Sequence, residues 1–138
     1  MPPRLLAQLT TVADDAWLER LLAVPGVERG LFTALASRFD AGAADGFEGR
    51  VTYELERPAT GGPSSRWTVQ VISGRAVLRP DDAADPVVAL RMSVADFIRV
   101  AAGAIDPAEP ILKGRAEVTG DLAVAAKLPE MFQAARPA

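Results

Sequence analysis

The sequence contains neither cysteine nor histidine. Without cysteine the chain has no disulfide bonds and no thiolate metal site, and without histidine it lacks the commonest metal ligand and general base. Catalysis would depend on carboxylates, hydroxyl groups, lysines or the single tyrosine, Tyr53, and these residues form no recognisable catalytic constellation. The sequence therefore predicts a protein that is not an enzyme, with no catalytic residues, no metal site and no cofactor.

A strong excess of one charge is also missing. The chain has 15 basic and 18 acidic residues, a net charge of −3, whereas a nucleic-acid-binding protein usually has a basic face. No apolar run approaches the roughly 18 residues that a membrane span requires, and the apolar core of the N-terminal segment is too short for a signal peptide. We therefore expect a cytoplasmic protein that does not bind nucleic acid and whose membrane contacts, if any, are transient.

The length of 138 residues and the 49% content of hydrophobic residues predict one soluble globular domain. Residues 1–46 are expected to be a helical segment of the same domain as residues 47–138. Apolar residues at helical spacing predict one helix that begins at an aspartate cap and ends at Pro25, and a second helix over residues 27–39. The segment before the first helix either extends it or forms a loose arm.

The middle of the chain alternates between apolar and polar residues, which is typical of strands with one buried face. Glycine and proline at residues 58–65 predict a loop, which could be mobile, and Ser73 with Gly74 predicts a hairpin turn. The five predicted strands cover residues 50–56, 66–72, 75–79, 87–92 and 114–119. Together with the helices they predict an α+β domain, with a mixed or antiparallel sheet of about five strands and helices packed on one face.

Two further helices are predicted around these strands. Ser93 with Asp96 is typical of a helix start, and Gly103 of a helix end. Near the C-terminus, Asp121 is expected to cap the last helix. Pro129 lies inside that helix and is expected to kink or break it.

Three segments occur in an order and spacing that resemble a known family. They are residues 67–74, with a tryptophan-bearing strand and turn; residues 92–103, with the capped helix; and residues 112–132, with the last strand, a Gly-Asp corner and the last helix. Together they resemble the sterol carrier protein type 2 (sterol-transfer) domains, over about residues 47–132. The resemblance implies an apolar tunnel between sheet and helices, which binds a fatty acid, a fatty acyl-CoA, a sterol or a phospholipid without covalent chemistry.

We expect the tunnel to be lined by apolar residues of the strands and of the last two predicted helices. The predicted lining residues are Trp67, Val69, Val71, Met92, Phe97, Ile98, Ala101, Leu112, Val118, Leu122, Ala125, Leu128, Met131 and Phe132. The implied partner is a lipid or another hydrophobic small molecule, and the protein is expected to be a lipid-transport protein that is a monomer or a homodimer.

Several alternatives remain open at the level of the sequence. The same apolar residues could form a filled core, in which case the chain would be an accessory or dimerisation domain that pairs with itself or with an enzyme. An enzyme that relies on carboxylates is the weakest of the three hypotheses. Lys113 and Arg115 either contact a carboxylate or phosphate head group or are ordinary surface charges. The acidic residues within 80–86 lack the spacing of a calcium loop and are interpreted as a solvated turn.

Overall fold

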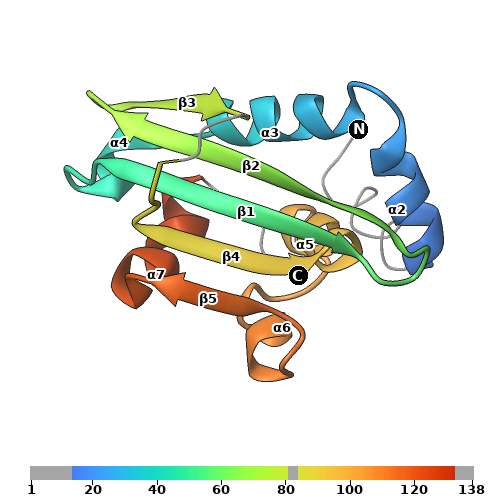
Figure 1. Cartoon of the computed structure of the whole chain (residues 1–138). Coiled ribbons are helices and arrows are strands. Elements are labelled where there is room, and N and C mark those ends of the chain that lie inside the picture. Colours follow the sequence, from blue (N-terminus) through green and yellow to red (C-terminus); the bar gives the residue numbers. More distant parts are fainter. Residues whose placement is uncertain (1–13, 81–83, 133–138) are drawn as a thin grey trace.

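The computed structural model describes residues 14–80 and 84–132. The predicted N-terminal arm and two aspartates of the acidic loop, Asp81 and Asp82, lie outside the described residues. The described chain forms one five-stranded sheet with helices packed against one of its faces (Figure 1). This confirms the predicted α+β architecture.

The sheet is mixed, with the strand order β3-β2-β1-β4-β5. At its centre, β1 (Gly49–Arg57) pairs antiparallel with β2 (Gly62–Ile72) and parallel with β4 (Val88–Ser93). The two edges are β3 (Arg75–Arg79), antiparallel to β2, and β5 (Glu117–Gly120), antiparallel to β4. Because β1 and β4 are parallel, both strands end on the same side of the sheet, measured along the strand direction.

The predicted loop after the first strand and the predicted hairpin turn at Ser73 and Gly74 are both present, but the loop is shorter than predicted. β2 begins at Gly62 rather than at residue 66, so the connection from β1 consists only of residues 58–61. The turn between β2 and β3 is as predicted, with positive φ angles of 51° at Ser73 and 74° at Gly74. Two consecutive positive φ angles are typical of the turn type that matches the twist of a two-stranded ribbon.

Four longer helices cover the buried face of the sheet or its end. α3 (Val27–Ser37) packs against β3, α5 (Val94–Ala101) against β1 and β4, and α7 (Leu122–Met131) against β4 and β5. α2 (Asp15–Ala23) packs against α3 and α5. In Figure 1, α2 lies beside the β1–β2 hairpin, whereas α7 lies at the opposite end of the sheet.

Side-chain caps begin three of these helices as the sequence predicts. Asp14 accepts a hydrogen bond from the amide of Trp17, and Ser93 accepts one from the amide of Asp96. Asp121 accepts hydrogen bonds from the first amides of α7. α7 continues past Pro129 to Met131, so the helix is not broken there. Pro129 lies in the last turn of the helix. Because proline has no amide hydrogen, the helix lacks the one backbone hydrogen bond that residue 129 would donate.

Two short helices lie in segments for which the sequence predicts no helix. α4 (Ala41–Ala44) begins at Asp40, whose carboxylate accepts hydrogen bonds from two amides of the helix. α6 (Ala108–Leu112) follows Pro107 and precedes β5. Small residues dominate the first segment and two prolines fall in the second, so neither shows the apolar periodicity of a longer helix.

Candidate functional site

Four aromatic rings fill the interior near the β1–β2 hairpin, a region that we call the hairpin end. Phe32 of α3 lies against Tyr53 of β1, Trp67 of β2 and Phe97 of α5, with ring centroids 5.5, 5.3 and 5.0 Å apart. Tyr53 and Phe97 also meet, at 5.6 Å. Rings at these separations are in contact, so the hairpin end is packed with side chains.

A buried glutamate joins this aromatic cluster to the hairpin. Glu28 of α3 accepts hydrogen bonds from Arg57 Nη2 at 2.8 Å, from Ser65 Oγ at 3.0 Å and from the indole nitrogen of Trp67. The side chains of Arg57 and Glu28 are only 7% and 11% exposed. An ion pair this well buried needs further hydrogen bonds to offset its desolvation, and the contacts of Glu28 to Ser65 and Trp67 supply them.

A second buried glutamate holds the tip of the same hairpin. Glu19 of α2 is completely buried, and its carboxylate accepts hydrogen bonds from the amides of Ala59 and Thr60 at 3.1 and 2.9 Å and from the Thr60 hydroxyl at 2.8 Å. The loop predicted at residues 58–65, for which the sequence left mobility open, is therefore tied to α2. A carboxylate that accepts several hydrogen bonds from one turn fixes the position of that turn.

Tyr53 lies within the cluster, and its burial raises the pKa of its phenol well above the usual range for tyrosine. Its ring contacts Phe32 and Phe97, so Tyr53 has a packing role in the cluster.

The interior at the opposite end of the sheet, which we call the α7 end, is built differently. Leu128 and Met131 of α7 are buried, and Phe132 just after the helix meets Phe39 at a ring-centroid distance of 5.6 Å. Ala125 is half-buried and packs against the core. The end of α7 is joined to the rest of the chain by a backbone hydrogen bond of 2.7 Å between the Asp40 amide and the Met131 carbonyl.

The structure places most of the predicted tunnel residues in the interior. Val69, Val71, Met92, Phe97, Ile98, Leu128, Met131 and Phe132 are buried, and Trp67, Ala101, Val118 and Ala125 are half-buried. Leu112 and Leu122 are different, because they are 83% and 66% exposed and do not line the interior. Leu112 ends the unpredicted helix α6, and Leu122 is the first residue of α7. That the interior residues line a ligand tunnel remains a prediction.

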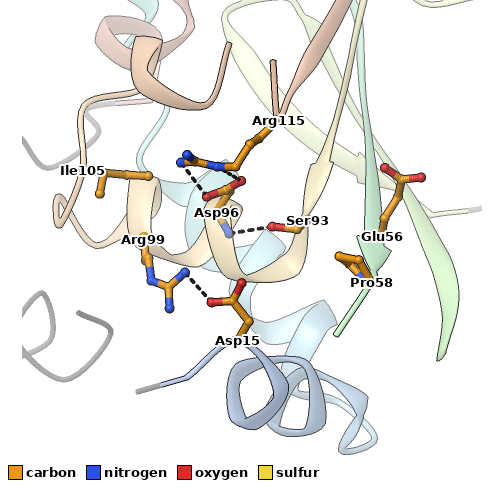
Figure 2. Close-up of a pocket in the computed structure, with 8 residues that line it drawn as sticks. All are labelled: Asp15, Glu56, Pro58, Ser93, Asp96, Arg99, Ile105 and Arg115. Atoms are coloured by element: carbon orange, nitrogen blue, oxygen red, sulfur yellow. Dashed lines mark hydrogen bonds and ion pairs between the residues drawn. The ribbon is translucent and has the colours of Figure 1, made fainter. Parts of the chain in front are cut away.

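A polar pocket of about 650 Å³ opens where β1 and β4 end (Figure 2). It is bounded by α2, the end of β1, the start of α5 and the segment before β5. Its lining residues are Asp15, Glu56, Pro58, Ser93, Asp96, Arg99, Ile105 and Arg115. A volume of this size is typical of pockets that bind small molecules or head groups.

Two ion pairs organise the polar pocket, and both are drawn in Figure 2. Arg115 donates to both carboxylate oxygens of Asp96 from Nε and Nη2, at 3.2 Å each, and Arg99 Nη1 lies 2.7 Å from a carboxylate oxygen of Asp15. The hydrogen bond to Asp96 raises the pKa of Arg115 above its ordinary value, so the guanidinium is permanently charged. Arg115 was one of the two cations that the sequence analysis connected with a head group; the other, Lys113, pairs with Glu109.

Neither a metal site nor a membrane span is found in the described part of the chain. Across residues 14–80 and 84–132, no group of three or more acidic side chains is arranged to hold a metal ion. No described helix combines the length and apolarity needed to cross a bilayer.

Comparisons with known proteins relate the chain to one family. The model of the SCP-2 sterol transfer family matches residues 32–133. By sequence, no curated protein matches the chain significantly. Among solved structures, apo sterol carrier protein 2 from Yarrowia lipolytica superposes with a TM-score of 0.59 and 14% identity, over 74% of this chain and 89% of that one.

Two further solved structures have the same fold. Palmitated sterol carrier protein 2-like 2 from Aedes aegypti has a TM-score of 0.56 and 19% identity, over 78% of this chain and 96% of that one. An inverting sec-alkylsulfatase from Pseudomonas sp. has a TM-score of 0.56 and 20% identity, over 75% of this chain. This chain spans only 15% of the length of the sulfatase. At these identities the likeness concerns the fold alone.

Proposed function

This chain belongs to the SCP-2 sterol transfer family, and from that premise we propose that it binds a lipid non-covalently and transfers it, without catalysing a reaction. The observation that carries the proposal is the family match across residues 32–133, which includes the whole sheet, the second half of α3, and α5 and α7. The palmitate of the Aedes aegypti protein suggests a long-chain fatty acid as a first ligand to test.

The α7 end is the part of the interior that we propose receives the acyl chain. The hairpin end is filled by stacked rings and held by one buried ion pair and the hydrogen bonds of Glu19, so opening it would separate many contacts at once. At the α7 end the only ring contact among the described residues is that of Phe39 with Phe132, and Met131 is an unbranched side chain that can adapt to ligands of varied shape. Pro129 also removes one hydrogen bond from the last turn of α7, which favours movement there.

Burial of the acyl chain would supply the binding energy. Each methylene removed from water contributes about 0.8 kcal/mol, so a chain of about a dozen contributes roughly 10 kcal/mol. The loss of translational freedom and the ordering of the chain oppose this gain, which leaves a dissociation constant on the order of micromolar. Such affinity suits a carrier, because it allows both uptake and release.

Two neighbouring alanines of α7 provide a matched test. Ala125 is half-buried against the core and Ala126 is exposed, so the same substitution projects inward at one position and outward at the other. We expect Ala125→Phe to weaken binding of a fluorescent fatty acid at least tenfold, because the ring occupies space under α7. Ala126→Phe should bind like the wild type. Circular dichroism would check that both variants are folded.

Equal binding by both folded variants would contradict an acyl site under α7. The proposal as a whole is tested by native mass spectrometry of the purified protein, followed by solvent extraction and identification of what is released. A released lipid supports it. A clean apo mass, together with no displacement of the fluorescent fatty acid, would contradict it.

A second function is favoured by the filled hairpin end and by the match to a small part of the sulfatase. In this alternative the chain is an accessory domain with a filled core, which pairs with itself or with an enzyme. It predicts a stable dimer or complex in light scattering and no extractable lipid. An extractable lipid bound to a monomer would exclude it.

A further inference from the structure

The sheet has a second face, which we call the open face, because α3, α5 and α7 pack against the other one (Figure 1). Side chains alternate between the two faces of a strand. On β3, Ala76 and Leu78 pack against the core, so Arg75 and Arg79 lie on the open face. Arg66 of β2 lies there too, because the residue that follows it packs against the core.

The part of the open face formed by β2 and β3 carries positive charge only. The two strands contain Arg66, Arg75 and Arg79, all exposed, and no acidic residue. None of these arginines takes part in an ion pair within residues 14–80 and 84–132. The part formed by β4 and β5 differs, because Arg91 is paired there with Glu117. We call the three arginines of β2 and β3 the basic area.

Carboxylates limit the basic area on the side of β1. Glu54 is the cross-strand partner of Arg66, and Glu48 accepts a backbone hydrogen bond at the turn between β2 and β3. Along β3, the four-residue separation of Arg75 and Arg79 corresponds to about 13 Å at 3.3 Å per residue. The basic area is therefore small, and it is bordered by charges of the opposite sign.

The guanidinium of Arg79 is held in place with donors to spare. It donates from Nε to the side-chain oxygen of Gln70 at 3.1 Å, which positions the group over β2. A guanidinium has five N–H donors, so the four on its two terminal nitrogens can still bind a carboxylate through two parallel hydrogen bonds. A planar group that is already positioned loses less freedom for each hydrogen bond that it forms.

We propose that the basic area docks an acidic segment of a partner protein, with carboxylates on Arg75 and Arg79. The proposal is independent of the proposed function, because the open face lies across the sheet from the interior. In an extended segment, acidic residues four positions apart are also about 13 Å apart and point to the same side. Such a segment matches the spacing of the two arginines of β3.

The size of the basic area favours a short protein segment over a larger anionic partner. A lipid bilayer or a nucleic-acid duplex would extend over Glu48 and Glu54 as well, where charges of the same sign repel it. A bilayer would also require several apolar side chains that insert into it. Among the described residues of the open face, Ile72 is the only large hydrophobic residue that is exposed.

The test measures the fluorescence polarisation of a labelled peptide of alternating glutamate and threonine. We expect the wild type to bind this peptide and not the corresponding peptide with glutamine in place of glutamate. Added salt should weaken the binding, because it screens exposed charges. Arg75→Glu combined with Arg79→Glu should weaken it at least about tenfold, because like charges then face each other.

Arg20→Glu combined with Arg29→Glu is the matched control. Both arginines are exposed, but they lie on α2 and α3, so this variant has the same change in net charge away from the open face. We expect it to bind the peptide within about twofold of the wild type, because charges farther away than the Debye length are largely screened. Circular dichroism and binding of the fluorescent fatty acid would verify that both double variants are folded.

Three outcomes would overturn the docking area. The wild type could fail to bind the acidic peptide, or the two double variants could weaken binding equally, which would indicate a response to net charge alone. Vesicles of phosphatidylserine and phosphatidylcholine, or duplex DNA, could bind through Arg75 and Arg79 while the peptide does not, which would assign the area to a different anion. Each outcome leaves the proposed function standing, because lipid binding is measured separately.

Discussion

The two ends of the interior are held together by different interactions. At the hairpin end, four aromatic rings contact one another, and the carboxylates of Glu19 and Glu28 fix the hairpin from two helices. At the α7 end, aliphatic side chains and one pair of phenylalanines pack under a helix that contains a proline. The difference indicates that stability is concentrated at the hairpin end, whereas local opening is easiest at the α7 end.

Removal of the buried glutamate Glu28 is the variant expected to destabilise the hairpin end most. Glu28→Ala leaves Arg57 buried without its counter-ion and leaves the indole of Trp67 without its acceptor. We expect the free energy of unfolding to fall by about 3–5 kcal/mol, because an unpaired buried charge is strongly destabilising. Urea denaturation followed by circular dichroism would measure the loss.

Glu54→Ala is the control for this change, because it removes the same side chain from an exposed position of β1. We expect it to alter stability by less than about 0.5 kcal/mol. Similar losses in both variants would show that the buried ion pair has no special weight at the hairpin end.

A milder way to probe the same end is to titrate its tyrosine. Burial raises the pKa of Tyr53 in the folded protein, so the folded state holds the phenol proton at pH values where the unfolded chain releases it. The stabilisation is fully present below the unfolded pKa near 10 and is lost as pH rises through the folded pKa. In this window we expect stability to fall by up to about 1.4 kcal/mol per pH unit.

Because Tyr53 is the only tyrosine in the sequence, its phenolate absorbance can be followed without interference. The absorbance should appear together with unfolding, and Tyr53→Phe should remove this part of the pH dependence. A phenolate signal near the ordinary pKa in a chain that stays folded would mean that the ring is accessible to water.

The smallest effect is expected from a substitution at the α7 end, where Pro129 interrupts the hydrogen bonds of the last turn. Pro129→Ala restores an amide that can donate to the carbonyl of Ala125 within α7. We expect stability to rise by about 1 kcal/mol and hydrogen exchange of the α7 amides to slow. Exchange at the hairpin end should not change. Uniform slowing across the chain would indicate that the two ends open as one unit.

Local sequence signals account for the parts of the fold that were predicted correctly. The caps of Ser93 and Asp121 and the turn at Ser73 and Gly74 each depend on residues within a few positions of one another. Alternating apolar residues predicted the strands at 50–56, 66–72 and 114–119 for the same reason, and the turn at Ser73 and Gly74 placed the strand at 75–79. Strand order could not be obtained in this way, because the parallel pairing of β1 with β4 joins segments separated by β2 and β3.

The buried acids were missed because their partners are distant in sequence. Glu19 meets Thr60, 41 residues along the chain, and Glu28 meets Arg57, 29 residues along. On α2, Trp17 and Leu21 are spaced to share one helix face with the buried Leu18 and Leu22, but they are 52% and 38% exposed. Periodicity assigns polar residues to the outside of a helix unless a remote partner is known.

The sequence predicted most of the apolar residues that lie in the interior, but it did not predict the location of the polar pocket. Apolar residues of the strands and of α7 do lie in the interior, as their phase indicated. Leu112 and Leu122 do not, because their orientation depends on where α6 and α7 begin and end. The polar pocket had one signal in the sequence, Arg115, but its partner Asp96 is 19 residues away and was interpreted only as part of a helix cap.

Both edges of the sheet are short and charged, which bears on aggregation. β3 has five residues with an arginine at each end, and β5 has four residues that include Glu117. Short strands with charged side chains discourage edge-to-edge pairing with another sheet. Self-association through a sheet edge is therefore disfavoured, whereas Trp17 and Leu21 of α2 and Val24 just after it form an exposed apolar area on the described surface.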